Sequence, residues 1–308
     1  NPPPLDASMP DERLELEWVH GLRCDDVREN VRYTSNGSIA YFTGKLAIVF
    51  NKDGGGLQRY YAGHADCILS LAIHEEGQIV ATGDLGRNPE IHIWDSTSLL
   101  NLTVLKGTHR RGVNLLRFGG SNGNRLVSCG LGKYHNVCLW DWQNSLLLAS
   151  FQGGLQKVLC IDLTPDGFGI VQCGVKHIKF HSVQGCNVVS QRGLIGRKGK
   201  VQTMLCIGWV GSRPVIGTQD GRLYCFEGRR LIQTVIAHET SVNCVYSCSE
   251  GLVSGGKDGK VKVWSTTLEC KREISMADLG CVRPSLRSVH WNSDDNRLLV
   301  AARSCEIF

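Results

Sequence analysis

Short apolar runs of four to six residues follow one another along almost the whole chain. The stretch LVSGGKDGKVKVWS, from Leu252 to Ser265, shows the pattern clearly: an apolar run, a turn with Asp258 and Gly259, and an alternating run that ends on Trp264. Clusters of Gly, Asn, Asp and Ser separate the runs, and no helical period extends beyond one turn. The pattern predicts an all-β protein.

The end of this unit recurs along the chain at a nearly constant spacing. The successive distances are 44, 46, 41, 45, 38 and 44 residues, and the recurring positions are Phe50, Trp94, Trp140, His181, Phe226, Trp264 and Phe308. A period of about 40–45 residues with four short strands is typical of a β-propeller blade. The two apolar faces of a blade can be covered only by neighbouring blades, so seven repeats predict a closed ring. We therefore expect an N-terminal segment over residues 1–30 and a seven-bladed propeller over residues 31–308.

The sixth repeat resembles a WD repeat, and the resemblance implies a hydrogen-bonded chain through His238, Ser254, Asp258 and Trp264. A buried indole N–H and a buried imidazole each need a partner. Much of the set recurs as His64, Thr82 and Trp94 in the second repeat and as His109, Ser128 and Trp140 in the third, whereas the fourth and fifth repeats lack the histidine and carry His181 and Phe226 in place of tryptophan. Because the trio recurs, we interpret it as structural rather than catalytic.

The N-terminal stretch LELEWVHGLRC alternates apolar residues at Leu14, Leu16 and Trp18, as a strand would. The first blade has sequence for four strands of its own, whereas the seventh ends on its third strand at Phe308. We expect the missing outer strand to come either from residues beyond 308 or from residues 14–19, and a strand there would cover an exposed sheet edge.

The stretch LEWVHGLRCDDVRENVRYTSNGSIAYFTGKLAIVFN (residues 16–51) closely resembles the HELP motif and first blade of the echinoderm microtubule-associated protein-like family. ATGDLGRNPEIHIWDS (81–96) resembles its second blade and GVKHIKFHSV (174–183) its fourth. Two positions depart from the pattern: His181 replaces a tryptophan, and Asp84 stands where an amide is expected. The resemblance implies a seven-bladed WD-repeat β-propeller preceded by a HELP segment.

The resemblance further implies a tandem of two propellers, of which this chain would be the first, with HELP packed in the seam between them. Trp18 would then contact a second propeller, an interpretation we favour over the closing strand; both predict a buried Trp18 in the intact protein. The implied activity is non-enzymatic binding of tubulin or microtubules, in the cytoplasm on the cytoskeleton. The alternative is a WD-repeat scaffold that recruits signalling or mitotic proteins through a propeller face.

Composition and motifs exclude several other classes of function. No apolar run approaches the roughly 20 residues of a membrane helix, so no membrane partner is expected. The fourteen cysteines form no CxxC pair, which favours reduced thiols and a cytosolic or nuclear compartment. Gly119–Gly123 matches GxSxG but falls where a hairpin turn is due, and GRKGK at 196–200 lacks the spacing of a phosphate loop. The histidines have no metal-ligand spacing. We predict no catalytic, cofactor or metal site.

Charge is distributed unevenly. The chain carries a formal charge of +5, but residues 185–235 contain eight basic and two acidic side chains, and the first thirty residues contain eight acidic and three basic ones. The basic region is either a solvated face or a patch for an acidic partner such as the tubulin surface. Nucleic acid is not expected, because aromatic residues for base stacking are missing from it. The predicted partner-binding residues are Arg192, Arg197, Lys198, Lys200, Arg229 and Arg230.

Overall fold

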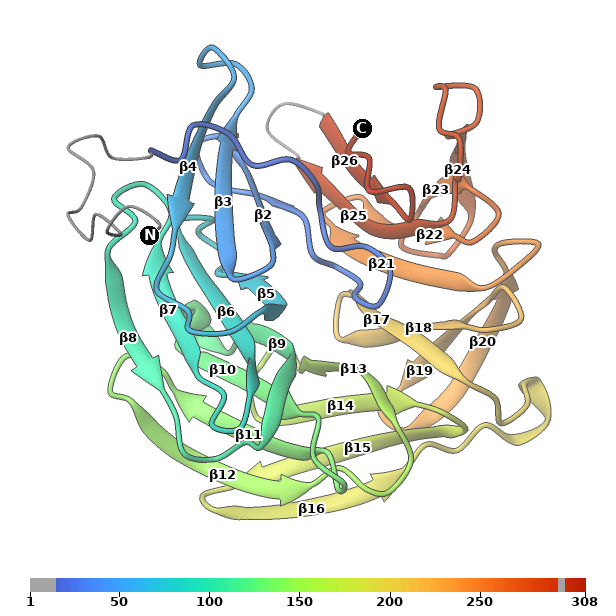
Figure 1. Cartoon of the computed structure of the whole chain (residues 1–308). Helices are drawn as coiled ribbons and strands as arrows, with labels where there is room; N and C mark the ends of the chain where they lie inside the picture. The colour runs from blue at the N-terminus through green and yellow to red at the C-terminus, as the bar shows by residue number, and fades with distance from the viewer. Residues whose placement is uncertain (1–14, 293–296) are drawn as a thin grey trace, which may run out of the picture.

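The computed structural model describes residues 15–292 and 297–308, and in it the chain forms antiparallel sheets arranged in a ring (Figure 1). The predicted all-β, seven-bladed propeller is confirmed. Neighbouring strands within each blade follow chain order, and the first strand of each blade lies innermost. Blades 2 and 3 are also joined by a short ladder that pairs Leu85 and Gly86 with Gly112 and Arg111.

The bounds of the strands are as follows. Blade 1 contains β1 (Arg32–Tyr33), β2 (Ile39–Thr43), β3 (Leu46–Asn51) and β4 (Leu57–Tyr61), and blade 2 contains β5 (Ile68–Ile73), β6 (Ile79–Gly86), β7 (Ile91–Asp95) and β8 (Asn101–Leu105). Blade 3 contains β9 (Arg111–Gly119), β10 (Arg125–Gly130), β11 (Asn136–Asp141) and β12 (Leu146–Gln152), and blade 4 contains β13 (Val158–Leu163), β14 (Gly169–Gly174), β15 (His177–Gln184) and β16 (Asn187–Arg192). Blade 5 contains β17 (Met204–Val210), β18 (Arg213–Thr218), β19 (Arg222–Glu227) and β20 (Arg230–Ile236), and blade 6 contains β21 (Val242–Cys248), β22 (Gly251–Gly256), β23 (Lys260–Trp264) and β24 (Cys270–Ser275). Blade 7 contains β25 (Leu286–Asn292) and β26 (Arg297–Ala302), with Ile307 bridged to Ala301.

The core is divided among the junctions between blades. Seven clusters of buried apolar side chains occur, and each combines residues from two adjacent blades. Trp94, for example, packs in the cluster between blades 1 and 2, and Trp264 in the cluster between blades 5 and 6. This arrangement follows from the apolar faces of the blades, since one sheet alone cannot bury both of its faces.

The four residues singled out in the sixth repeat form a chain of hydrogen bonds. His238 Nε2 lies 2.8 Å from the Ser254 hydroxyl oxygen, which also accepts the Trp264 indole N–H at 2.9 Å. His238 Nδ1 lies 3.0 Å from the Asp258 carboxylate, which accepts backbone N–H groups of Glu239 and Lys260 as well. Burial opposes ionisation of Asp258, but these hydrogen bonds outweigh it and lower the pKa of the carboxyl. The chain ties the link before β21 to two strands of the blade.

Asp258→Ala is expected to lower the free energy of unfolding by about 1–3 kcal/mol, because a buried His238 nitrogen and two backbone N–H groups would lose their acceptor. Asp220→Ala, at the equivalent turn of blade 5, should cost less, because Asp220 pairs with more exposed groups such as Lys200 and Arg222. Denaturant unfolding of both variants measures the difference. Equal midpoints for Asp258→Ala and the wild type would contradict the structural role of the chain.

Blade 2 contains the same chain, and Asp84 explains one departure noted in the sequence. The Asp84 carboxylate lies 3.0 Å from His64 Nδ1, and His64 Nε2 lies 2.7 Å from the Thr82 hydroxyl, which accepts the Trp94 indole N–H at 3.1 Å. Asp84 therefore accepts the histidine hydrogen bond in blade 2, as Asp258 does in blade 6. An amide could not accept through both side-chain oxygens, as Asp84 does from His64 and from the Glu90 N–H.

Blade 3 has an incomplete chain. His109 Nε2 lies 2.7 Å from the Ser128 hydroxyl, which accepts the Trp140 indole N–H, but the buried His109 Nδ1 has no hydrogen-bond partner. Gly132 occupies the position that Asp258 holds in blade 6, four residues after the serine. A Cβ at Gly132 would meet nothing closer than a backbone oxygen at 4.0 Å.

Gly132→Asp is therefore expected to raise the free energy of unfolding by about 1–2 kcal/mol, by supplying the missing acceptor to His109. Denaturant unfolding at pH 7 is the measurement. Gly132→Ala is the matched control. Replacing glycine reduces the conformational entropy of the unfolded chain, which by itself stabilises a protein by about 0.4–1 kcal/mol, and alanine supplies no acceptor to His109. An aspartate variant no more stable than the alanine variant would contradict the expectation.

The N-terminal segment fills the junction between the first and seventh blades (Figure 1). Leu22 and Cys24 are buried in one cluster with Ile48 of β3 and with Leu299 and Ala301 of β26. The backbone N–H of Glu29 donates to the Arg287 carbonyl of β25 at 2.9 Å, and the Ser288 hydroxyl donates to the Val31 carbonyl. In the described part of blade 7, two strands and the short Glu306–Phe308 edge cannot cover blade 1 alone, so the segment provides the remaining apolar contact.

The predicted strand over residues 14–19 is not present: Leu14 lies outside the described residues, and residues 15–19 form no strand. Instead, the Gln58 side chain donates to the Val19 carbonyl at 3.1 Å and accepts the Val19 N–H at 2.9 Å. Because a side-chain amide of β4 takes these hydrogen bonds, the segment crosses the face of blade 1 and does not pair with a strand edge. The closing-strand interpretation is wrong for these residues.

Trp18 is 42% exposed and packs edge-on against Phe50, with ring centroids 5.8 Å apart.

A buried group of charges lies inside the ring, where the N-terminal segment meets the innermost strands. The Glu29 side chain is 7% exposed and contacts the guanidinium groups of Arg32 and Arg117. Arg32 donates to the Ser288 hydroxyl of blade 7 at 2.8 Å, and Arg117 lies on β9 of blade 3. One carboxylate therefore connects the N-terminal segment to blades on two sides of the ring.

Candidate functional site

The antiparallel order of the strands sorts every connecting segment onto one of two faces. The links that enter the first strands, and the turns between second and third strands, lie at one end of each sheet, around the mouth of the central cavity. We call this end the channel-mouth face. The turns between first and second strands and between third and fourth strands lie on the opposite face.

The six residues predicted to bind a partner are all exposed, but they do not share one face. Arg192 ends β16, and Arg197, Lys198 and Lys200 lie in the link from β16 to β17, which runs along the outer strand β20 of blade 5 and reaches the channel-mouth face near Lys200. Arg229 lies in the turn between β19 and β20, on the opposite face, and Arg230 begins β20 beside it. The prediction treated the stretch as one patch because these residues are close in sequence, whereas the reversal of chain direction separates them.

The link over residues 193–203 is held firmly against the outer edge of blade 5. The Leu194 N–H donates to the Arg229 carbonyl at 2.7 Å, and its carbonyl accepts from Leu231. Farther along, the Thr234 hydroxyl donates to the Lys198 carbonyl at 2.8 Å, and the Lys198 ammonium donates to the Ile232 carbonyl at 2.7 Å. A loop fixed in this way presents its cations in a defined position.

The two faces differ strongly in charge. In the described links and turns of the channel-mouth face after β1, 13 basic side chains stand against six acidic ones, whereas the opposite face has two basic and six acidic; residues 15–31, which lead into β1 at the channel mouth, add two basic and five acidic side chains. The basic residues of the channel-mouth face are Lys45, Arg87, Lys106, Arg110, Lys133, Lys157, Lys176, Arg197, Lys198, Lys200, Lys257, Arg283 and Arg303, and the acidic ones are Asp66, Glu90, Asp220, Glu239, Asp258 and Asp278. On the opposite face the corresponding residues are Lys52 and Arg229, and Asp53, Glu75, Glu76, Asp166, Glu250 and Glu269.

Two further cations belong to this surface and were missed by the sequence reasoning. Lys179 of β15 lies directly opposite Arg192 of β16, and Lys176 is in the turn before β15. Together they border a cavity of about 360 Å³ between blades 4 and 5, whose described lining contains no carboxylate. Burial, and then the charge of Arg192, lowers the pKa of Lys179. Like charges opposite each other destabilise a sheet, so the pairing is typical of a surface that attracts anions. Only the strand register brings them together.

The described residues give little support to a catalytic or metal-binding site. Histidines beside serines, such as His238 and His109, are used in the chains that hold the blades together. No group of His, Cys, Asp or Glu within 15–292 and 297–308 is arranged to hold a metal ion. All fourteen cysteines fall in the described part and are unpaired. The GxSxG match is the turn between β9 and β10, as expected. Within these ranges, no helix is long and apolar enough to span a membrane.

Comparison with known proteins identifies the fold and the segment before it. A family model described as the first β-propeller of echinoderm microtubule-associated proteins matches residues 57–308, and the HELP motif matches residues 9–48. The HELP match thus extends through β1 and β2 into β3.

Curated relatives agree over most of the chain. Echinoderm microtubule-associated protein-like 4 is 31% identical in Mus musculus, over 88% of this chain and 30% of its own length, and 30% identical in Xenopus tropicalis, over 97% and 35%. Echinoderm microtubule-associated protein-like 2 of Rattus norvegicus is 32% identical, over 90% of this chain and 45% of its own length. This chain therefore spans less than half of these relatives. The chain belongs to the echinoderm microtubule-associated protein family, with its HELP motif and first β-propeller.

Proposed function

We propose that this chain is non-enzymatic and binds tubulin or microtubules through its channel-mouth face, on the cytoplasmic cytoskeleton. The relatives are microtubule-associated proteins by name, which supports a role of the same kind. The observation that carries the proposal is the charge asymmetry: the links and turns after β1 place 13 basic against six acidic side chains on the channel-mouth face and two against six on the other, and with residues 15–31 included the channel-mouth face has 15 basic against 11 acidic. Such a field steers an acidic partner toward one face and repels it from the other.

Arg197, Lys198 and Lys200 are the cations we expect to contribute most, because they are exposed, closely spaced and fixed by the contacts of the link. Lys200 already pairs with Asp220 at 3.1 Å, but its side chain is 68% exposed, so this ion pair contributes little and can exchange for a partner carboxylate. Arg192, Lys176 and Lys179 extend the same surface toward blade 4.

Charge reversal tests the proposal. The triple variant Arg197→Glu, Lys198→Glu, Lys200→Glu should weaken co-pelleting with microtubules severalfold, and wild-type binding should weaken between low and physiological salt, because screening acts within about 8–10 Å. The matched control is Lys52→Glu, Arg229→Glu, Arg230→Glu, which changes the net charge equally at the other end of the sheets. Thermal unfolding of both confirms an intact fold. Equal affinity for the two triples would remove the link from the interface.

A second candidate function, recruitment of other proteins, is supported by apolar side chains on the same face. Leu155 and Val201 are 70% and 64% exposed and border the cavity between blades 4 and 5. A scaffold that binds through this cavity would show affinity that is insensitive to salt and lost in Leu155→Ser. Retained microtubule binding in that variant would separate the two functions. We expect neither a membrane nor a nucleic-acid partner.

The half-exposed Trp18 supports a further part of the proposal, that a second propeller packs against the HELP segment. Trp18 and Leu16 are 42% and 53% exposed on the outside of blade 1. Apolar side chains gathered at a surface favour a protein contact. In a longer protein with a second propeller, Trp18 should become protected, which the emission maximum of its indole and hydrogen exchange of its neighbours would reveal. An unchanged exposure would contradict the seam.

A further inference from the structure

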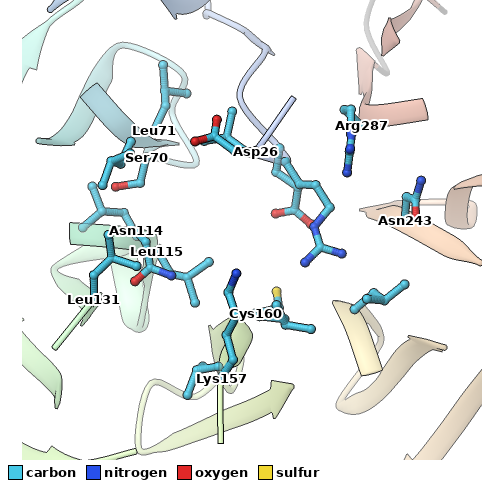
Figure 2. A pocket seen from close by; sticks show the side chains of 18 of the residues that line it. Asp26, Ser70, Leu71, Asn114, Leu115, Leu131, Lys157, Cys160, Asn243 and Arg287 are labelled. Carbon is cyan, nitrogen blue, oxygen red and sulfur yellow. The ribbon is translucent and has the colours of Figure 1, made fainter. Parts of the chain in front are cut away.

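A cavity of about 600 Å³ opens at the centre of the channel-mouth face, where the innermost strands begin (Figure 2). Its walls come from the first strands of blades 2 to 7 and from Asp25–Glu29 of the N-terminal segment. Ser70, Asn114, Lys157, Asn243 and Arg287 all line it from different blades. The cavity is therefore a product of the closed ring.

Three cations line this cavity with little internal neutralisation. Arg28 and Lys157 have no ion pair or side-chain hydrogen bond in the described structure, and Arg287 donates to the Asp25 carbonyl at 3.0 Å but leaves its buried Nε without a partner. Figure 2 shows the Lys157 side chain pointing into the cavity. Arg28 is close enough to Arg287 to lower its pKa further, after the effect of burial.

The acidic residues of the rim and wall have cation partners of their own. Asp26 forms an ion pair with Arg23 at 2.6 Å, and Asp25 approaches Arg303 at 3.4 Å. Glu29 contacts Arg32 and Arg117. The three cations are thus left to an external anion, and guanidinium groups are suited to carboxylates because they can donate two parallel hydrogen bonds.

The rest of the lining indicates which anion fits. Partly exposed leucines line the wall on blades 3 to 5, beside Lys157 and across from Arg28 and Arg287: Leu115, Leu131, Leu159 and Leu205. Asn114 adds a buried carbonyl oxygen without a hydrogen-bond partner, which can accept from a backbone N–H. Spaced cations, apolar surface and an amide acceptor match a peptide, which has carboxylates, apolar side chains and backbone N–H groups. A compact polyphosphate has neither of the last two.

We infer that the central cavity binds an acidic peptide segment of a partner protein, with its carboxylates on Arg28, Lys157 and Arg287 and its apolar side chains on the leucines. This inference goes beyond the proposed function, because it concerns the interior of the ring mouth and a class of peptide rather than the microtubule surface. The cavity and the link over residues 193–203 can therefore be tested separately.

The experiment measures binding of a fluorescent peptide of about twelve residues, in which glutamate alternates with leucine and glycine, by anisotropy. The double variant Arg28→Gln, Lys157→Gln should weaken its binding about tenfold, because two charge-assisted contacts are lost. Lys106→Gln is the control, since it lies on the same face but outside the lining. A peptide with glutamine in place of glutamate should bind weakly.

Three results would overturn the inference. The first is equal affinity of the double variant and the wild type for the peptide, and the second is equal affinity of the wild type for the glutamate and glutamine peptides. The third is displacement of the peptide by tripolyphosphate, together with leucine-free polyglutamate binding as tightly as the peptide. The last result would make the cavity a general polyanion site. Microtubule co-pelleting of the same double variant tests the proposed function separately. A variant that loses peptide binding but co-pellets normally shows that the cavity and the microtubule-binding surface are different sites.

Discussion

Glu29→Ala is expected to lower the free energy of unfolding by about 3–5 kcal/mol, because it leaves two buried guanidinium groups without their shared carboxylate. Arg32 and Arg117 both contact Glu29, and all three side chains are at most 19% exposed. Breaking such a group by removing one member costs far more than losing a surface ion pair. Chemical denaturation at pH 7 gives the free energy directly.

Glu29 also occupies an unusual backbone position. Its φ of 55° lies in the left-handed region, and its N–H is held by the Arg287 carbonyl. Glu29→Gln is therefore the second variant to measure, since it keeps the side-chain shape and the backbone conformation but removes the negative charge. The control is Glu75→Ala, an exposed carboxylate of the opposite face, which should change stability by less than about 0.5 kcal/mol. A loss below about 1 kcal/mol in Glu29→Ala would show that the cluster does not hold the junction.

Lowering the pH from 7 to 5 is expected to reduce the free energy of unfolding by about 3–5 kcal/mol. Burial lowers the pKa of His109 to about 4, and burial, followed by the charges of Lys179 and His177, lowers the pKa of His181 to about 4. Both lie below the value of about 6.5 for an unfolded histidine. Between pH 6.5 and 4 the unfolded chain therefore binds more protons, and acid favours unfolding. Each histidine accounts for about 2 kcal/mol at pH 5.

One carboxyl acts in the opposite direction. Burial raises the pKa of Asp162 to about 6, against the effect of Arg117, so the folded state takes up this proton first between pH 6 and 3.8. The resulting gain of about 1 kcal/mol at pH 5 offsets part of the histidine effect. The pKa of His290, lowered well below its ordinary value by burial, adds to the loss.

His181→Phe identifies the source of the acid sensitivity. Its ring would keep the contact with Phe151, and the buried His181 Nε2 has no partner, so only the hydrogen bond between His181 Nδ1 and the Ser190 hydroxyl would be lost. Urea unfolding at pH 7, 6 and 5 should show a loss about 2 kcal/mol smaller in this variant than in the wild type. Gly132→Asp should reduce the loss in a different way, by stabilising a protonated His109. A wild-type stability that does not change between pH 7 and 5 would contradict the low pKa values.

Local sequence determined the blades themselves. Alternation, glycine-rich turns and the recurrence from Phe50 to Phe308 gave the number of blades, because these signals depend on neighbouring residues within one hairpin. The chain of hydrogen bonds through His238, Ser254, Asp258 and Trp264 followed from the resemblance to a WD repeat, since all four residues belong to one repeat. The HELP resemblance identified the N-terminal segment but not its place between blades 1 and 7.

The tertiary structure decided what lies between repeats. The alternation at Leu14–Val19 predicted a strand, but the side chain of Gln58, nearly forty residues later, takes the hydrogen bonds of Val19. The basic stretch of residues 185–235 predicted one patch, but chain reversal places Arg229 and Lys200 on opposite faces. Conversely, Arg28, Lys157 and Arg287 are separated by over a hundred residues in sequence and meet only at the channel mouth. Local patterns set the sheets because hairpin contacts are short in sequence, whereas faces, the ring junction and the central cavity depend on closure of the ring.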